Sequence, residues 1–179
     1  GETETGVTTF FIEKDIDTGK IIFQAKEPIA VNDDAGTVYD RLKEIGADLI
    51  LKTVYAIEEG EYPQVAQDES QELRAAPKIF RETCEINWDQ NAELLHNFVR
   101  GLSPYPAAWT LLNGQVCKIF NTSVVHEEAA VGEPGSFDTD NKSYLHFAAA
   151  DGMVSIEVLQ LQGKKRMTIS EFLRGNKLV

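Results

Sequence analysis

Residues 108–120 read AWTLLNGQVCKIF, two runs of largely apolar residues on either side of Asn113-Gly114. Asn-Gly favours a two-residue hairpin turn, because both turn positions require positive φ angles. We therefore expect paired strands over 108–112 and 116–120. Turn residues and short apolar runs predict three further strands, over 135–139, 144–149 and 154–161. Five short strands with intervening turns are compatible with a small closed barrel.

Two helices are expected on either side of these strands. Residues 89–100 place apolar side chains at helical spacing, and Gly101 is expected to end that helix. Near the C-terminus, Thr168 followed by Glu171 forms the capping-box pattern that opens a helix, and Gly175 is expected to end it.

The first third of the chain has a different pattern. Strands are expected over 8–12 and 21–25, joined by an acidic loop in which Gly19 supplies turn freedom. Apolar residues then recur at helical spacing over 37–59, which predicts a long amphipathic helix that begins at Thr37 with a capping box. Residues 61–77 carry prolines and few large apolar side chains, which is typical of a linker.

Composition limits the function. The chain has 179 residues, with 17 basic against 29 acidic, and its net charge of −12 argues against non-specific nucleic-acid binding. No apolar run approaches the roughly 18 residues of a membrane span, so no membrane partner is expected. Cys84 and Cys117 are too few for a disulfide framework, and we expect buried free thiols in a reducing cytoplasm.

Asp15 and Asp17 are the candidates for chemistry in the acidic loop. If the loop continues a strand, both carboxylates project to one face and could act as a general base or stabilise a cationic amine. Asp-x-Asp-Thr-Gly is also ordinary turn chemistry, which spacing alone favours. His96, His126 and His146 lack metal-ligand spacing, and no nucleotide-binding or hydrolase motif is present.

Several segments together resemble the methionyl-tRNA formyltransferase family. ETGVT at 4–8 followed by DIDTG at 15–19 is similar to a signature shared by formyltransferases. FVRGLSPYPAAW at 98–109 is similar to a run of the tRNA enzyme, with Ala107 where glycine is usual. The other similar segments are APKI at 76–79, INW at 86–88, GKK at 163–165 and FLRGN at 172–176. The resemblance covers essentially the whole chain.

The resemblance implies a fold and an activity. It implies an α/β remnant of a Rossmann-like catalytic domain over 1–62, a linker over 63–81 and an all-β OB-type barrel domain over 82–179. The implied reaction transfers a formyl group from the co-substrate 10-formyltetrahydrofolate to the amino group of methionyl initiator tRNA. It implies a cytoplasmic enzyme that needs no metal, with a monomer as the family expectation.

The resemblance also assigns the acidic loop. Asp17 would be the catalytic aspartate, and Glu13, Asp15, Ile16 and Asp17 would line the folate pocket. The family's catalytic Asn and His belong to a segment before ETGVT that this chain does not contain. We therefore expect a C-terminal piece that is inactive alone, because it lacks the oxyanion donors, and a 37–59 helix that exposes an apolar face.

A contact with tRNA is implied through basic side chains that would bind phosphates without reading sequence. The candidates are Lys78, Arg81, Lys118, Lys164, Lys165, Arg166 and Arg174. Residues 82–179 hold 8 basic and 12 acidic residues, so weak and strongly salt-dependent binding is expected. Trp88, Tyr105 and Trp109 could be stacking platforms, but packing in a core or hinge is the better interpretation.

Two alternatives stay open. One is another folate-dependent formyltransferase or hydrolase, acting on an amino sugar or on free formyl-folate; the segments at 86–88 and 98–109 disfavour it. The other is a stand-alone nucleic-acid-binding module without chemistry, and the intact acidic loop disfavours that.

Overall fold

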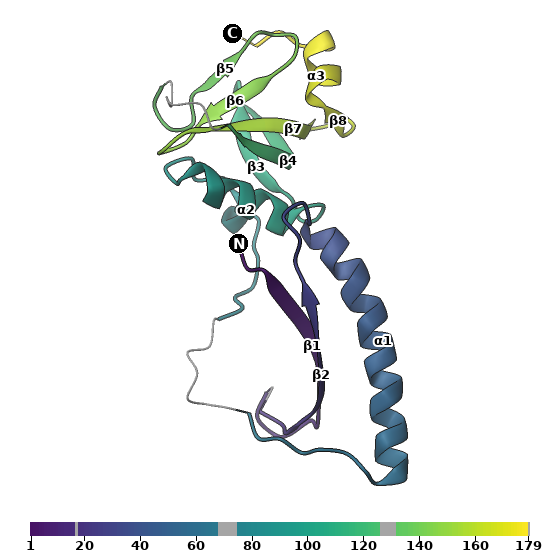
Figure 1. Ribbon diagram of the computed structural model, residues 1–179. Coiled ribbons are helices and arrows are strands. Elements are labelled where there is room, and N and C mark those ends of the chain that lie inside the picture. The colour runs from purple at the N-terminus through teal and green to yellow at the C-terminus, as the bar shows by residue number, and fades with distance from the viewer. Residues whose placement is uncertain (17, 68–74, 126–131, 179) are drawn as a thin grey trace. The chain divides into compact units, whose positions relative to one another are not determined.

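The computed structural model describes residues 1–16, 18–67, 75–125 and 132–178 (Figure 1). The chain forms two compact units. The N-terminal unit comprises Glu2–Asp33 and Thr37–Pro77, and the C-terminal unit comprises Gly1, Asp34–Gly36 and Lys78–Val179. Within the described ranges, no helix has both the length and the apolar character needed to cross a membrane.

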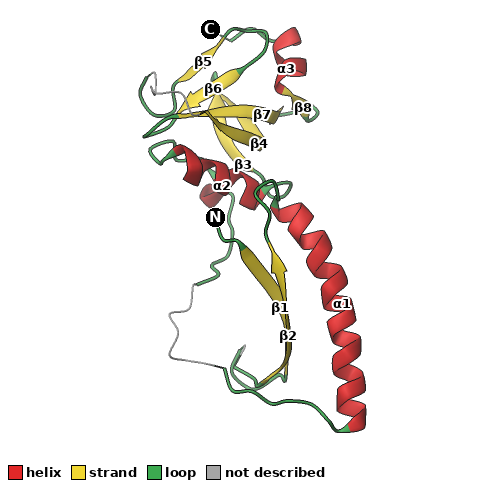
Figure 2. Ribbon diagram, in the orientation of Figure 1, coloured by secondary structure: helices red, strands yellow, loops and turns green. Residues whose placement is uncertain are grey.

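Two antiparallel strands and a long helix form the N-terminal unit. Strand β1 (Glu4–Phe10) pairs with β2 (Ile21–Pro28), with a bulge where Thr9 meets Phe10. Helix α1 (Ala35–Glu59) runs along this hairpin (Figure 2), and the hydroxyl oxygen of Thr53 lies 2.9 Å from that of Thr9. The predicted strand–loop–strand segment and long helix are confirmed, although β1 begins at Glu4 rather than at residue 8.

The predicted capping box at Thr37 is wrong. Helix α1 begins at Ala35, so Thr37 lies inside its first turn, and its hydroxyl donates to the Asp33 carboxylate at 3.4 Å. That carboxylate also accepts the backbone N–H of Ala30 at 2.7 Å. The polar anchor of the helix start is therefore an aspartate that precedes the helix.

Arg41 joins this anchor to the hairpin. Its two terminal nitrogens donate to the two carboxylate oxygens of Asp33, at 3.0 and 2.6 Å, and its Nε donates to Glu27 of β2. Such fork-shaped pairing is the strongest form of carboxylate recognition by arginine. The hydrogen bonds from Arg41 are the main reason that the pKa of Asp33 is lowered to about 2.

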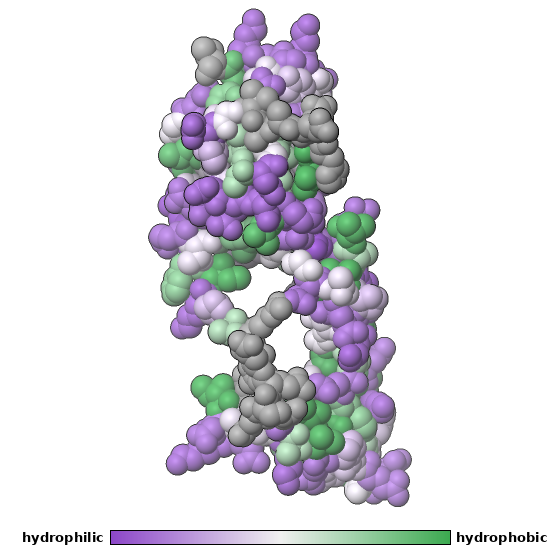
Figure 3. Space-filling model, turned by 60° about the vertical axis from the view of Figure 1, so that its left-hand side comes forward, coloured by the Kyte–Doolittle hydropathy of each residue, from purple (hydrophilic) through white to green (hydrophobic). Residues whose placement is uncertain are grey.

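Helix α1 leaves much of its apolar face exposed. Leu49 and Thr53 are buried, whereas Ile50, Val54 and Ile57 are 57%, 47% and 39% exposed. Apolar patches accordingly reach the surface of this unit in Figure 3. The expectation that this helix exposes an apolar face is confirmed.

An antiparallel sheet forms the C-terminal unit. Its strands are β3 (Ala108–Leu112), β4 (Gln115–Val125), β5 (Phe137–Thr139), β6 (Leu145–Ala148), β7 (Met153–Leu161) and β8 (Met167–Thr168). The sheet order is β3-β4-β7-β6-β5, and β8 pairs with β7. All five expected strands are present, and β8 is a sixth among the described residues. Among the described pairings β3 and β5 are the ends of the path, so the closed barrel stays a prediction.

The turn between β3 and β4 forms as predicted. Leu112 pairs with Gln115, which leaves two residues in the turn. Asn113 and Gly114 have φ angles of 48° and 76°, the positive values that this turn requires.

In the described part of this unit, three helical elements accompany the sheet: the 3₁₀ helix η1 (Glu82–Cys84), α2 (Ala92–Leu102) and α3 (Ile169–Gly175). The capping box of Thr168 and Glu171 at the start of α3 is confirmed. Gly101 does not end α2, contrary to the prediction. The helix continues to Leu102, whose buried side chain extends the apolar face and offsets the cost of an internal glycine.

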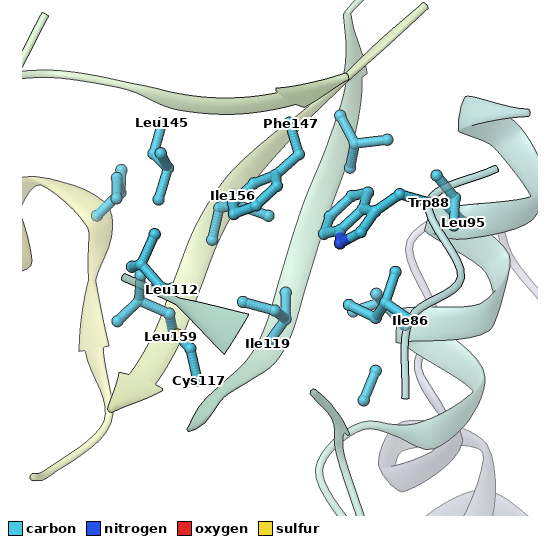
Figure 4. Packing of buried hydrophobic residues seen from close by; sticks show 14 of the residues in the cluster. Ile86, Trp88, Leu95, Leu112, Cys117, Ile119, Leu145, Phe147, Ile156 and Leu159 are labelled. Atoms are coloured by element: carbon cyan, nitrogen blue, oxygen red, sulfur yellow. The ribbon is translucent and has the colours of Figure 1, made fainter. Parts of the chain in front are cut away.

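An apolar cluster joins the sheet to α2 and also includes residues of α3 and of the C-terminal tail (Figure 4). The Trp88 ring stacks on Phe147, with centroids 4.4 Å apart and planes 7° from parallel. Its indole N–H donates to the Thr110 hydroxyl at 3.0 Å, so the polar atom of this buried ring is satisfied. Cys84 and Cys117 are buried free thiols, as predicted, and burial raises the pKa of Cys117 to about 12.

The C-terminal tail is held by one side chain. Asn141, in the turn between β5 and β6, donates its amide N–H to the Leu178 carbonyl at 3.1 Å and accepts the Leu178 N–H at 2.7 Å. Its backbone has a positive φ of 56°. The Leu178 side chain is buried in the apolar cluster, so the tail is fixed by both polar and apolar contacts.

Candidate functional site

The acidic loop between β1 and β2 is tied together at its base. The Phe11 N–H donates to the Lys20 carbonyl at 3.2 Å, and Ile21 and Val65 exchange backbone hydrogen bonds of 2.8 and 3.0 Å. The Gln67 side chain donates to the Gly19 carbonyl at 2.9 Å. These bonds fix where the loop begins and ends.

Gly19 is required by a close approach of the backbone. A Cβ atom at this position would lie 1.6 Å from the carbonyl oxygen of Phe11. No side chain fits at that distance, so the loop base forms only with glycine here.

Three of the four predicted folate-pocket residues are described, and all three are exposed: Glu13, Asp15 and Ile16. Within the described part of the chain, the Glu13 and Asp15 carboxylates take part in no hydrogen bond or ion pair. The backbone carbonyl of Asp15 accepts the Thr18 hydroxyl at 3.0 Å. The loop therefore presents free acceptor oxygens that suit a ligand rich in N–H donors. Asp17, the predicted catalytic residue, lies outside the described residues.

A second candidate site is a cavity of about 550 Å³ in the C-terminal unit. Its walls come from the chain around η1, the segment before β3, the β3–β4 pair and the end of β7. Two of the predicted tRNA contacts, Arg81 and Lys118, line it together with Phe80, Tyr105 and Trp109.

Arg81 and Lys118 are both positioned by contacts at this cavity. The Arg81 guanidinium carbon lies 5.6 Å from the centroid of the Trp109 ring, and the indole N–H donates to the Arg81 carbonyl at 2.9 Å. Lys118 is the cross-strand partner of Trp109, and its Nζ donates to the Pro106 carbonyl at 3.2 Å. Paired residues share one face of a sheet, so Lys118 lies on the same face as the Trp109 ring. Because Arg81 stands over that ring, the two cations belong to one surface.

Two other predicted tRNA contacts adjoin this cavity in the chain. Lys78 precedes the lining residue Ile79, and Lys164 follows the lining residue Gly163. The Lys164 carbonyl accepts the Gln160 side-chain amide at 2.7 Å, which ties the β7–β8 loop to the cavity wall.

The remaining three predicted contacts group around α3 and β4. The Arg166 guanidinium carbon lies 3.6 Å from the Phe120 ring centroid. Lys165 and Arg174 lie near Glu171 of α3. The pKa of Glu171 is lowered mainly by hydrogen bonds from Thr168, and the charges of Lys165 and Arg174 lower it further. The structure thus divides the predicted basic residues into a cavity group and a group near α3.

The three aromatic candidates have different environments. Trp88 is buried in the core, as predicted, and Trp109 is partly buried. Tyr105 is 85% exposed, so it does not pack in the core, and packing in a hinge stays a prediction for it. It lies between Pro104 and Pro106, which keep the segment out of the regular strand that follows.

Sequence reasoning missed Phe80, which is 59% exposed at the cavity. It lies in an irregular segment where neither helical nor strand spacing applies. The sequence feature that could have identified it is the pair of large apolar residues Ile79 and Phe80 within the predicted linker.

The described histidines have ordinary structural partners. His96 Nδ1 lies 3.1 Å from the Thr122 hydroxyl, and the His146 ring lies 4.5 Å from the Tyr144 ring. His126 lies outside the described residues. In the described ranges, no group of His, Cys, Asp and Glu side chains could hold a metal ion.

Comparison with known families decides the relationship. Residues 78–177 match the C-terminal domain of formyl transferases, and residues 1–54 match the formyl transferase domain that precedes it. This chain belongs to the formyl transferase family. Both candidate sites lie within these matched ranges, the acidic loop within 1–54 and the cavity within 78–177.

Curated relatives of this chain carry a specific name. It is 47% identical to the methionyl-tRNA formyltransferase of Phocaeicola vulgatus, over 98% of this chain and 56% of that protein. It is also 47% identical to the methionyl-tRNA formyltransferase of Parabacteroides distasonis, over 100% of this chain and 58% of that protein. The chain therefore spans little more than half the length of these relatives.

A solved structure has a similar fold. WlaRD, a sugar 3N-formyl transferase studied with dTDP and 5-N-formyl-THF, aligns with this chain at a TM-score of 0.66 and 25% identity. The alignment covers 92% of this chain and 57% of WlaRD.

Proposed function

We propose that this chain is part of a methionyl-tRNA formyltransferase, which transfers a formyl group from 10-formyltetrahydrofolate to the amino group of methionyl initiator tRNA. The observation that carries the proposal is 47% identity to proteins of that name over 98–100% of the chain. This similarity extends through both matched domains, including the acidic loop.

The acidic loop would supply acid–base chemistry. Formyl transfer needs a neutral amine nucleophile and a stabilised tetrahedral oxyanion. Asp17 would accept the proton released by the attacking amine, or orient a histidine of the whole protein that does so. The co-substrate would supply the formyl carbon. The chain alone would be inactive, because the Asn and His that hold the oxyanion belong to the rest of the whole protein.

The same loop would form part of the folate site. Glu13, Asp15 and Ile16 would line it beside Asp17. The free carboxylate oxygens of Glu13 and Asp15 fit the N–H donors of a pteridine edge, since ionised carboxylates only accept hydrogen bonds. Gly19 and the bonds at the loop base would hold these groups in one conformation.

The C-terminal unit would bind the tRNA. Its basic side chains would neutralise phosphates, and the cavity group and the group near α3 would both take part. We assign residues 1–62 to a Rossmann-like domain, 63–81 to a linker and 82–179 to an OB-type barrel in a cytoplasmic enzyme. The antiparallel sheet of short strands supports the barrel assignment.

Substitution of Asp17 in the protein encoded by the complete reading frame tests the proposal. We expect Asp17→Ala to lower kcat/KM for formylation of methionyl initiator tRNA by about 10²–10⁴, the usual contribution of a positioned acid or base. Asp40→Ala, at an exposed carboxylate on α1, is the control and should retain the activity. An unchanged rate for Asp17→Ala would reduce this residue to a turn former.

The likeness to WlaRD favours a second candidate, an amino-sugar formyltransferase. The same preparation should be assayed with a dTDP-linked amino sugar in place of the charged tRNA. The proposal predicts no formylation of the sugar. Turnover of the sugar without turnover of methionyl-tRNA would replace the first candidate by the second.

A further inference from the structure

We propose that the cavity of the C-terminal unit binds one unpaired nucleotide of RNA, with the base against its exposed aromatic side chains and the phosphate beside Arg81 and Lys118. The inference rests on the proposed function, because it names the part of the tRNA that this unit would receive. It goes beyond phosphate contacts, since the base itself enters the protein.

The cavity has a size that suits such a group. Its volume of about 550 Å³ lies within the range of roughly 300–1,000 Å³ that is usual for small-molecule sites. It opens between segments that are far apart in the chain, from Phe80 near η1 to Gly163 after β7. A base and its sugar form a compact ligand of this class.

The aromatic side chains offer stacking surfaces. Phe80 is 59% exposed and Tyr105 is 85% exposed, although both line the same cavity. Large exposed apolar groups that gather at one place usually mark a binding site. Unpaired bases stack on such rings whatever their sequence, because every base has a π-face.

The charge of the cavity favours an anion. The chain carries a net charge of −12, yet the described lining residues include two cations, Arg81 and Lys118, and neither aspartate nor glutamate. Neither cation forms an ion pair with a carboxylate among the described residues. Because its described walls carry two cations and no carboxylate, the cavity is complementary to phosphate although the protein as a whole is acidic.

Both cations keep donors for that phosphate. Lys118 uses one of its three ammonium hydrogens for the Pro106 carbonyl, which positions the charge and leaves two donors. The Arg81 guanidinium stands over the Trp109 ring. Stacking in this way leaves the N–H edges of an arginine available to an anion.

The test uses the 179-residue chain and a short single-stranded RNA with one 2-aminopurine between uridines. Stacking on an aromatic ring quenches the fluorescence of this base, so the signal reports base contact and not phosphate contact. Anisotropy of an end-labelled copy reports total affinity. We expect binding with quenching for the single strand, whereas a fully paired duplex of the same length should bind through its phosphates alone, more weakly and without quenching by the protein.

Tyr105 gives the decisive variant, because its exposed ring forms no hydrogen bond among the described residues. Tyr105→Ala should abolish most of the quenching and weaken affinity about tenfold, whereas Tyr105→Phe should restore both. Tyr55→Ala is the matched control, since Tyr55 is 62% exposed on α1 and does not line the cavity. Equal quenching by Tyr105→Ala and the unsubstituted chain would overturn the proposal.

Two further outcomes separate this inference from the proposed function. If Lys164→Gln with Lys165→Gln weakens RNA binding while Tyr105→Ala does not, the tRNA contact stands and the nucleotide site is wrong. If tetrahydrofolate displaces the 2-aminopurine and its own binding needs Tyr105, the cavity is a folate site and the proposal is also wrong. A Tyr105→Ala chain with unchanged thermal unfolding excludes loss of fold as the cause.

Discussion

The two units are stabilised in opposite ways. In the C-terminal unit, residues from every helix and most strands meet in one buried apolar cluster. In the N-terminal unit, large apolar side chains of α1 remain exposed, and polar groups such as Arg41 join the helix to the hairpin. Helical spacing of apolar residues therefore specifies a helix even where the described chain does not bury the apolar face.

The largest loss of stability should follow from truncating a side chain in the C-terminal core. Phe147→Ala removes a fully buried ring that stacks on Trp88, so we expect a loss of about 3–5 kcal/mol in the free energy of unfolding. Denaturant titration followed by tryptophan fluorescence measures it. Phe147→Leu should lose less, and a loss below about 1 kcal/mol for the alanine variant would contradict the packing described.

A smaller effect should appear in the N-terminal unit at low pH. Arg41 lowers the pKa of Asp33 to about 2, below the ordinary value near 4, so the ionised form is favoured by folding. The contribution of the ionised Asp33 carboxylate to the stability of the fold is therefore complete above about pH 4 and is lost as the pH falls through about 2.

Helical circular dichroism between pH 6 and pH 2 measures this loss, with Asp33→Asn as the reference. The difference in stability between the two proteins should shrink as Asp33 becomes protonated. Added salt should also reduce it, because Arg41 acts partly through its charge. A constant difference over this range would mean that the Arg41 fork does not stabilise the unit.

The smallest effect should come from the exposed face of α1. Ile50→Ala should change the free energy of unfolding by no more than about 0.5 kcal/mol, since the side chain is mostly exposed and alanine favours helices. Ile156→Ala, the same change at a fully buried position of β7, should cost about 2–5 kcal/mol. Equal losses at the two positions would mean that α1 is covered in solution.

Local chemistry explains which parts of the fold could be predicted. The turn at Asn113-Gly114 and the capping box of Thr168 and Glu171 each depend on residues within four positions. The local sequence is therefore enough to predict both. The start of α2 is only partly local: the Asn91 side chain accepts the Leu94 N–H, but the Ala92 N–H donates to the Asp151 carboxylate, 59 residues further along the chain. Burial of Leu102 likewise carries α2 past Gly101.

The candidate sites divide in the same way. The acidic loop is one continuous segment, and the sequence motif that marks it also contains Gly19, whose steric role the structure explains. The cavity draws on Phe80, Tyr105, Lys118 and Gly163, which only the fold brings together. The family resemblance named its cations as candidates and left Tyr105 as a possible stacking platform, but only the fold shows that this exposed ring lies at the same cavity.

Position 141 imposes two structural requirements on its residue. The residue must accept a positive φ, which favours Gly, Asn and Asp, and it must offer both a donor and an acceptor to the backbone of Leu178. Glycine lacks the amide, aspartate lacks the donor, and glutamine is poorly suited to the backbone. Asparagine alone among the common residues meets both demands, so position 141 has almost no freedom to vary. Position 178, held through its backbone, needs only an apolar side chain of suitable size.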